Sequence, residues 1–331
     1  MHKLSYTFVI FAMLFMSSCE EQKSKEDYSL SSPDGKNTVT FSLTEAGKPT
    51  YTIAHDGVVV VDTSAMGFDL KDLDALSEDF EIIKTETSTA DETWQMPWGE
   101  QLEVRNHYNE LIIYLQETSE NKRKLNIHFK AYNDGIGFRY EFPEQENLDE
   151  FIIADENTEF SLTGDHKTWW IPGDWDIYEH LYSETKFSEI DALAKANNPD
   201  LNASYIPENA VNTPVTMKTA EGLYLSFHEA DLTDYAGMTL KVNQSEHKMI
   251  SELVGSERLG GKAQIKAPFN TPWRTIQIAD RAGDLIESKM ILNLNDPNEL
   301  GDVDYFTPMK YVGIWWEMHI GKSTWDMEGT Q

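Results

Sequence analysis

Aromatic and acidic side chains are concentrated in one short segment, residues 169–182, which reads Trp-Trp-Ile-Pro-Gly-Asp-Trp-Asp-Ile-Tyr-Glu-His-Leu-Tyr. Three of its carboxylates, Asp174, Asp176 and Glu179, fall within six residues. Aromatic faces stack on the apolar faces of sugar rings, and carboxylates bind hydroxyl groups or a hard cation such as Ca²⁺. The segment is therefore a candidate sugar or calcium site. The alternative is a loop whose aromatic side chains belong to the core and whose acids face water.

Two further clusters combine aromatic and polar residues. One is Pro97–Gly99 followed by Arg105–Tyr108, and the other is Pro272–Thr275. We take Trp175, Trp273 and Arg274 as the candidate substrate-binding side chains. A guanidinium next to an indole is also a common structural pair, so the second cluster has a structural alternative.

Several motifs with defined chemistry are absent from the sequence. Gly321–Thr324 resembles the end of a phosphate-binding loop, but Trp316 stands where that motif needs its first glycine. There is no His-Glu-x-x-His, no Gly-x-Ser-x-Gly and, with a single cysteine, no Cys-x-x-Cys. The sequence therefore does not support a P-loop, zinc-peptidase or serine-hydrolase site.

The chain is strongly acidic. It has 331 residues, with 27 Lys and Arg against 57 Asp and Glu, and its net charge is −30. Phosphate backbones would be repelled, so we exclude nucleic acid as a partner. With 40% hydrophobic residues the chain can bury a sizeable core. One cysteine cannot form an intramolecular disulfide.

The first residues predict export and a lipid anchor. A basic start, a short apolar run and small residues before Cys19 indicate a lipoprotein signal peptide over residues 1–18. The apolar run is too short to span a membrane. We expect lipidated Cys19 to begin the mature chain, residues 19–28 to form an acidic tether, and the protein to be a periplasmic or outer-membrane lipoprotein. The alternative is an ordinary signal with an incidental cysteine.

Strand-like alternation dominates the mature chain. Apolar and polar residues alternate over residues 38–43, 111–116, 125–131 and 136–142, which places one face of each strand on a core. Turn signals separate such strands at Pro33–Gly35, His55–Gly57 and Asn133–Gly135. We predict a mainly β protein with a large antiparallel β-sandwich over residues 29–295. A short helix is expected over residues 188–196, with Ser188 as its N-cap.

The end of the chain has a different pattern. Residues 296–331 begin as a loop and then contain Tyr311–Trp316, an apolar run typical of a strand that is buried on both faces. Such a strand needs neighbours, which the short remaining tail cannot supply. We therefore expect the natural chain to continue beyond residue 331.

Several segments together resemble the N-terminal half of glycoside hydrolase family 97, the α-glucosidase and α-galactosidase family of Bacteroidota. The segments occur in the family's order and are spread across the mature chain. They are residues 31–35, 104–110, 131–140, 170–172, 221–229, 234–238, 271–278 and 310–316.

The resemblance implies an N-terminal super-sandwich of the galactose-mutarotase type, a central (β/α)₈ barrel and a small C-terminal β domain. Tyr311–Trp316 would be the first strand of a truncated barrel. The catalytic carboxylates would then lie beyond residue 331, so we assign no catalytic residue. The family also uses Ca²⁺, and the best match for the glutamate that the sandwich donates is Glu179, with Glu184 and Glu189 close by.

These observations lead to one expected function and two alternatives. We expect the N-terminal fragment of a calcium-dependent, exo-acting α-glycosidase that hydrolyses α-linked oligosaccharides and is anchored to a membrane by lipid. A stand-alone carbohydrate-binding lipoprotein without catalysis is the first alternative. A structural or interaction domain whose aromatic residues form its core is the second.

Overall fold

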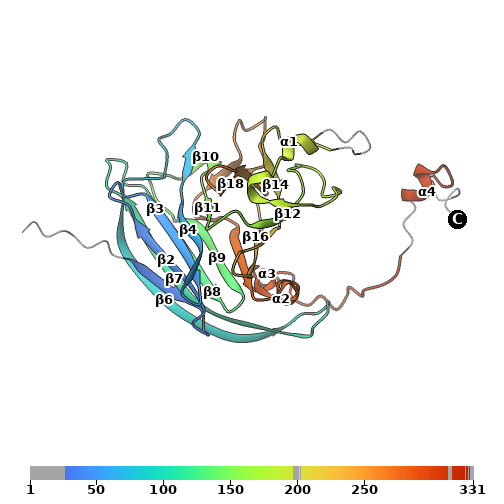
Figure 1. The fold of residues 1–331 in the computed structure, drawn as a ribbon, viewed down its shortest axis with the longest axis horizontal. Coiled ribbons are helices and arrows are strands. Elements are labelled where there is room, and N and C mark those ends of the chain that lie inside the picture. Colours follow the sequence, from blue (N-terminus) through green and yellow to red (C-terminus); the bar gives the residue numbers. More distant parts are fainter. Residues whose placement is uncertain are drawn as a thin grey trace, which may run out of the picture.

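The computed structural model describes residues 27–196, 201, 203–311, 315–324, 326 and 328 (Figure 1). The predicted signal peptide, Cys19 and nearly all of the predicted tether lie outside the described residues. Within the described part, no helix is long and apolar enough to cross a membrane.

β-strands are the main secondary structure of the described chain, as the alternation predicts. The strands are β1 (Tyr28–Ser31), β2 (Asn37–Leu43), β3 (Pro49–His55), β4 (Val58–Ala65), β5 (Phe68–Leu70), β6 (Phe80–Gln95), β7 (Glu103–Glu117), β8 (Lys124–Tyr132), β9 (Gly135–Phe142), β10 (Glu150–Glu156), β11 (Glu159–Leu162), β12 (Lys167–Trp170), β13 (Ser183–Lys186), β14 (Ala210–Asn212), β15 (Val215–Lys218), β16 (Tyr224–Ala230), β17 (Met238–Asn243), β18 (Lys248–Leu253), β19 (Ala263–Lys266), β20 (Phe269–Asn270) and β21 (Trp273–Ala279).

Two large antiparallel sheets face each other and enclose one core (Figure 1). The first has the order β1-β2-β3-β4-β11-β18-β17-β14, and the second has β13-β12-β15-β16-β21-β9-β8-β7-β6, with β20 beside β9. A small sheet, β19-β10-β5, lies apart from both orders. Ring contacts cross between the large sheets, with centroids 4.9 Å apart for Tyr51 and Phe138 and 5.5 Å apart for Phe160 and Phe227. The predicted antiparallel sandwich is confirmed.

The observed strands and turns have the residue patterns from which they were predicted. In β2, buried residues alternate with half-buried ones, so that Val39 and Phe41 lie in the core. The β3–β4 hairpin turns at Asp56 and Gly57, with φ angles of 47° and 79°. Hairpin turns favour Asp-Gly because both central residues need positive φ. All three predicted turn signals lie in turns between strands or directly before one.

The predicted helix over residues 188–196 is wrong in its extent and its cap. The structure has a 3₁₀ turn, η1 (Phe187–Glu189), and a separate short helix, α1 (Ala192–Lys195). Asp191 caps α1, because its carboxylate accepts the N–H of Ala194 at 3.0 Å. Ser188 instead donates both its N–H and its hydroxyl to Asp165, at 2.8 and 2.9 Å.

Three short helices follow the last strand. They are α2 (Ala282–Glu287), α3 (Met290–Leu294) and α4 (Trp315–His319). Met290 and Leu294 of α3 pack against Tyr132 and Trp273, on the side of the second sheet that faces away from the main core. α3 therefore covers part of the outer face of the second sheet (Figure 1).

The predicted strand Tyr311–Trp316 is not observed. Residues 312–314 lie outside the described residues, while Trp315 and Trp316 begin α4 and are 61% and 69% exposed. A parallel strand needs hydrogen-bond partners on its neighbours, and none of the described residues pairs with this segment. A helix satisfies its own backbone, which explains the difference.

Candidate functional site

Residues 171–182, here called the aromatic loop, connect β12 to β13 and are organised by one buried carboxylate. Asp174 is 3% exposed, and its Oδ1 accepts the backbone N–H groups of Asp176, Ile177 and Ser204 at 2.8–3.2 Å. Its Oδ2 lies 2.9 Å from Nε2 of His180. The side chain of Asp174 therefore fixes the backbone at Asp176 and Ile177 as well as the ring of His180.

The charge of Asp174 is stabilised by these contacts. Burial alone would raise the pKa of Asp174, but the N–H donors of Asp176 and Ile177 and the ring of His180 outweigh it, and the pKa lies below its ordinary value. Asn212 supports the same turn from β14, because its amide accepts from the N–H of Asp174 at 3.0 Å and donates to the carbonyl of Ile177 at 3.3 Å. The loop is thus pre-formed and its anchor is ionised at neutral pH.

The aromatic residues of this segment divide into two groups. Trp170 is 2% exposed and belongs to the core. Beyond Asp174 the side chains turn outward, with Trp175 40%, Tyr178 60% and Tyr182 62% exposed. Aromatic faces that remain open to solvent are available to stack on a ligand. The structure therefore favours the binding interpretation for the second group and the core interpretation for Trp170.

Two hollows flank the aromatic loop. One, of about 460 Å³, lies between Trp175 and Tyr178 on one side and Leu232, Gly237 and Val254 on the other, with Glu229 among its lining residues. The other, of about 650 Å³, is lined by Glu179, His180 and Leu181 together with α1. A ligand could therefore contact the outward aromatic residues from either side.

Of the three glutamates considered as calcium ligands, only Glu179 has a carboxylate without a hydrogen bond or ion pair to the described residues. Glu184 accepts from the indole of Trp169 at 2.9 Å and pairs with Lys167 at 2.6 Å. Glu189 accepts the N–H of Lys186 at 3.1 Å. Glu179 is exposed and has no hydrogen bond or ion pair with the described residues. No three potential metal ligands gather in the described part of the chain, so Glu179 could provide only part of a metal site.

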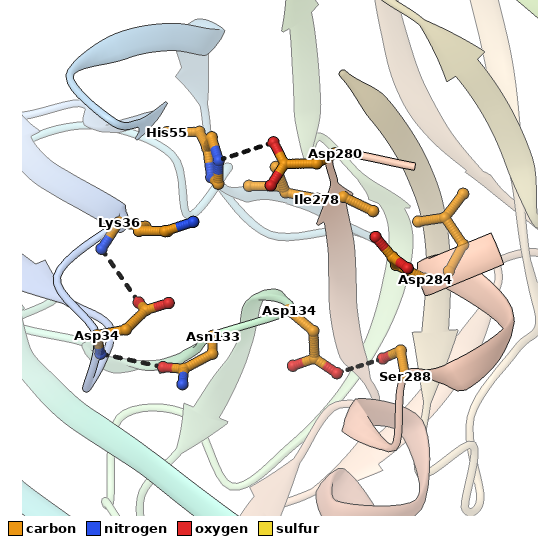
Figure 2. A pocket seen from close by; sticks show the side chains of 11 residues that line it. Asp34, Lys36, His55, Asn133, Asp134, Ile278, Asp280, Asp284 and Ser288 are labelled. Carbon is orange, nitrogen blue, oxygen red and sulfur yellow. Dashed lines mark hydrogen bonds and ion pairs between the residues drawn. The ribbon is translucent and has the colours of Figure 1, made fainter. Parts of the chain in front are cut away.

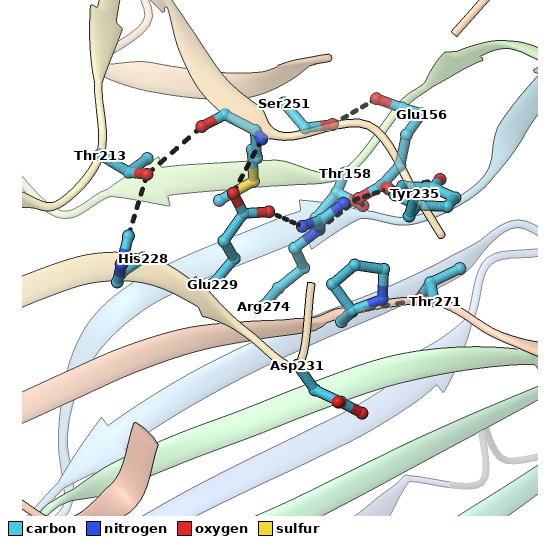
Figure 3. Close-up of polar contacts among 12 residues, drawn as sticks. Glu156, Thr158, Thr213, His228, Glu229, Asp231, Tyr235, Ser251, Thr271 and Arg274 are labelled. Atoms are coloured by element: carbon cyan, nitrogen blue, oxygen red, sulfur yellow. Dashed lines mark hydrogen bonds and ion pairs between the residues drawn. The ribbon is translucent and has the colours of Figure 1, made fainter. Parts of the chain in front are cut away.

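Trp273 and Arg274 are placed very differently from Trp175, and Figure 3 shows Arg274 between Glu156 and Glu229. Trp273 and Arg274 are 1% and 0% exposed, on β21 in the middle of the second sheet. The guanidinium of Arg274 binds Glu156 through Nε and Nη2, at 2.8 and 2.6 Å, and Glu229 through Nη1 at 2.8 Å. All three polar ends of Arg274 are thus engaged, and a sugar could not reach it without dismantling this packing. We therefore correct the prediction that Trp273 and Arg274 contact substrate.

The three charges of this buried cluster stabilise one another unequally. Burial would lower the pKa of Arg274, but Glu156 and Glu229 outweigh it, and the pKa is raised. Burial would raise the pKa of Glu156, but Arg274 outweighs it, and the pKa is lowered. Burial raises the pKa of Glu229 despite Arg274. Glu229 also lines the hollow beside Trp175, a placement that strand periodicity could not show.

A model of the glycosyl-hydrolase 97 N-terminal domain matches residues 30–297. The chain belongs to glycoside hydrolase family 97. It is 23% identical to a retaining α-galactosidase of Bacteroides thetaiotaomicron, over 98% of this chain and 48% of that protein. The chain thus spans about half the length of this curated relative.

Solved structures of a family 97 enzyme from Pseudoalteromonas sp. strain K8 are also similar to this chain. A variant in complex with panose is 35% identical, with a TM-score of 0.80 over 92% of this chain and 43% of that one. The complex with acarbose is 36% identical, with a TM-score of 0.78 and the same coverage. A β-arabinopyranosidase at 20% identity and a TM-score of 0.66 shares the fold.

The remaining cluster of this family 97 chain, near Trp98, has partners of its own. Trp98 is 41% exposed, and its ring lies 5.5 Å from that of Phe306 in the segment that follows α3. Arg105 forms a bidentate, exposed pair with Asp91 across the β6–β7 hairpin, at 2.7 and 2.8 Å. Trp98 and Arg105 thus already have partners within the chain, so the aromatic loop remains the candidate functional site.

Proposed function

We propose that this chain is the N-terminal part of a calcium-dependent, exo-acting α-glycosidase that hydrolyses α-linked oligosaccharides. The observation that carries the proposal is the aromatic loop: in a family 97 domain, a pre-formed loop presents open aromatic faces beside an uncommitted glutamate. The sandwich would form one wall of the sugar pocket.

The relatives support the substrate class. The curated relative is a retaining α-galactosidase, and the solved family 97 enzyme was crystallised with panose and with acarbose. In the proposed enzyme, Trp175 and Tyr178 would stack on a sugar ring and fix its orientation. Whether glucose or galactose is preferred depends on hydroxyl contacts that this chain does not determine by itself.

Calcium would bind beside this wall. A bound Ca²⁺ takes six to eight oxygen ligands and supplies positive charge near the sugar. The carboxylate of Glu179 suits this hard cation, but it can fill only one or two of those positions. Glu179 would therefore hold the ion at the sandwich side, and we expect this chain alone to bind Ca²⁺ poorly.

Catalysis would depend on residues outside this chain. Glycoside hydrolysis needs two carboxyl groups flanking the bond, one as acid and one as nucleophile or base. We place both beyond residue 331, in the predicted barrel. This sandwich would then position the sugar and help exclude water, without transferring a proton itself.

Hydrolysis of nitrophenyl α-glucoside and nitrophenyl α-galactoside tests this division of labour. We expect the purified 331-residue chain to show no turnover above its Glu179→Gln variant. Turnover clearly above that control would contradict the proposal that the missing part carries the chemistry.

The lipid anchor is a second part of the proposal. We expect Cys19 to carry lipid and to hold the protein at a periplasmic or outer-membrane surface, and Cys19→Ser should release it from the membrane fraction. Intact mass of the native protein from that fraction also separates the two leading functions. A mass near twice 37.9 kDa supports the glycosidase. A mass near that of residues 19–331 plus lipid would favour a stand-alone carbohydrate-binding lipoprotein.

A further inference from the structure

The three predicted turns converge on a pocket at one end of the sandwich (Figure 2). Asp34, His55 and Asn133 come from the turns that precede β2, β4 and β9, and the end of β21 with α2 closes the other side. The enclosed volume is about 140 Å³. We call this the turn pocket. Its lining residues are Asp34, Lys36, His55, Asn133, Asp134, Ile278, Ala279, Asp280, Asp284, Leu285 and Ser288.

The frame of the turn pocket is held by hydrogen bonds between the turns. The N–H of Asp34 donates to Oδ1 of Asn133 at 3.1 Å. The hydroxyl of Ser288 donates to Asp134 at 2.5 Å, and the N–H of Ile278 donates to the carbonyl of Asp134 at 3.0 Å. These bonds join segments far apart in sequence, so the pocket is pre-formed.

His55 directs an unused hydrogen-bonding atom into this pocket. The amide nitrogen of Asn37 donates to the carbonyls of Tyr132 and Asn133, at 3.0 and 3.1 Å. The amide oxygen of Asn37 must therefore accept from Nδ1 of His55, which lies 2.7 Å away. In the neutral ring this leaves a lone pair on Nε2. The side chain of His55 is 7% exposed, and its Nε2 has no hydrogen-bond partner among the described residues, with the carboxylates of Asp56 and Asp280 at 3.7 and 3.9 Å.

The remaining groups of the pocket include acceptors, donors and an apolar wall. Asp280, whose Oδ1 lies 3.9 Å from Nε2 of His55, and Asp284 offer carboxylate acceptors. Lys36 has no ion pair among the described residues and extends toward the cavity (Figure 2). Since Asn133 uses its oxygen for Asp34, its amide nitrogen is a second donor. Ile278 and Leu285 form the apolar side.

This combination selects one class of ligand. An anion would face four aspartates against Lys36. No three potential metal ligands gather there within the described chain, so a bare metal ion lacks a preformed site. A sugar ring has hydroxyl groups that both donate and accept, and a C–H face that packs on aliphatic side chains. The pocket has a volume of about 140 Å³ and is partly open to solvent, so a small polar molecule can enter it from the surface.

We propose that the turn pocket binds a single neutral hexose ring, whose hydroxyls donate to His55 and Asp280 and accept from Lys36. The site is separate from the aromatic loop. Arg274 contacts Glu229 beside that loop, whereas Asp280 directly follows the far end of β21, six residues further along the chain and roughly 20 Å away. The inference does not depend on the proposed hydrolysis, because it concerns binding alone.

Calorimetric titration of the purified 331-residue chain with glucose, galactose and their α-methyl glycosides tests the proposal. We expect saturable binding of one ring, weakened at least tenfold by Asp280→Ala and by Lys36→Ala. Asp69→Ala on β5 is the matched control for an exposed aspartate, and Trp175→Ala tests the aromatic loop. Asp69→Ala should leave this binding unchanged, whereas any hexose binding that Trp175→Ala removes belongs to the aromatic loop. An α-linked trisaccharide distinguishes a free hexose from the end of a chain: equal binding means that a terminal ring fits.

Nitrogen-detected NMR gives a second readout at His55. The resonance of its Nε2, assigned by its loss in His55→Asn, should shift as hexose is added. The proposal is overturned if no hexose binds saturably, if Trp175→Ala abolishes the binding while Asp280→Ala and Lys36→Ala do not, or if Nε2 of His55 does not respond at saturation.

Discussion

The aromatic loop and the stretch Pro272–Thr275 look alike in sequence, because each places tryptophan beside charged groups, yet the protein uses them in opposite ways. In the loop, Asp174 is buried and satisfied while Trp175 turns outward. On β21, Trp273 and Arg274 are both buried, and Arg274 is fully paired with Glu156 and Glu229.

The comparison shows what separates a structural from a functional charge. A buried charge is tolerated only when its hydrogen bonds are completed inside the protein, and it then has none left for a ligand. Glu179 lies at the other extreme, exposed and uncommitted. The identity of neighbouring residues is therefore a weaker guide than the partners that the fold supplies.

Removing the buried cation should have the largest effect on the protein. Arg274→Met leaves Glu156 without its main partner at 0% exposure, and we expect a loss of about 3–5 kcal/mol in the free energy of unfolding. Urea denaturation measures it. Arg105→Met, which breaks the exposed pair with Asp91, is the control and should change little. If the two variants lost equal stability, the structural role of Arg274 would be refuted.

Removing the anchor of the aromatic loop should have the next largest effect. Asp174→Ala deletes the acceptor for three backbone N–H groups, and we expect a loss of about 2 kcal/mol in the free energy of unfolding. Hydrogen exchange should increase at Asp176 and Ile177. Glu179→Ala, at an exposed position in the same loop without a hydrogen bond or ion pair to the described residues, is the control. Unchanged exchange in Asp174→Ala would show that another contact holds the loop.

The charged network around His128 tests the comparison through the pH dependence of the free energy of unfolding. Burial would lower the pKa of His128, but hydrogen bonds to Glu110 and Glu141 outweigh it, and the pKa is raised. Hydrogen bonding by His128 lowers the pKa of Glu141, and the pKa of Glu110 is lowered as well despite its burial.

The stability from this network should therefore depend on pH in a defined direction. The contribution of His128 is complete below its unfolded pKa of about 6.5 and is lost as pH rises through its raised folded pKa. The carboxylates contribute above about pH 4.3 and lose that contribution as pH falls. We expect His128→Asn to cost about 1 kcal/mol near pH 6 and less near pH 9. His107→Asn on β7 is the control, and an equal loss at both values would contradict the assignment.

Among these variants, removal of the outward-facing side chain of Trp175 should change the free energy of unfolding least and ligand binding most. Trp175→Ala is expected to change the free energy of unfolding by less than about 0.5 kcal/mol, because the side chain is 40% exposed. In the native-length protein, loss of stacking worth about 1 kcal/mol should raise KM for an α-linked oligosaccharide roughly fivefold. An unchanged KM together with a large loss of stability would place Trp175 in the core instead.

Much of the fold could be predicted from the sequence because strand alternation and Asp-Gly turns are local signals. The strands around Phe41, Ile127 and Phe138 follow this pattern, and so does the hairpin at Asp56 and Gly57. The cap at Asp191 was missed because Ser188 is drawn to Asp165, a partner that only the folded chain brings close.

The candidate site was predictable in part. The composition of residues 169–182 identified the aromatic loop. Which of its aromatic residues face outward depends on the contact between Asp174 and Asn212, two residues that are distant from each other in sequence. The burial of Arg274 depends on Glu156, 118 residues away, and no local pattern reports such a pairing. For the same reason the turn pocket was not anticipated, although each of its three turns was.

Calcium titration of the native-length protein tests the central claim most directly, namely that the aromatic loop is functional and supplies Glu179 to the metal. We expect Glu179→Gln to weaken Ca²⁺ binding and calcium-dependent hydrolysis of nitrophenyl α-glycosides at least tenfold. Glu184→Gln, whose carboxylate is already bound to Lys167 and Trp169, should leave both within about twofold of the unmodified protein. Equal calcium affinity in the Glu179→Gln variant and the unmodified protein would contradict the account.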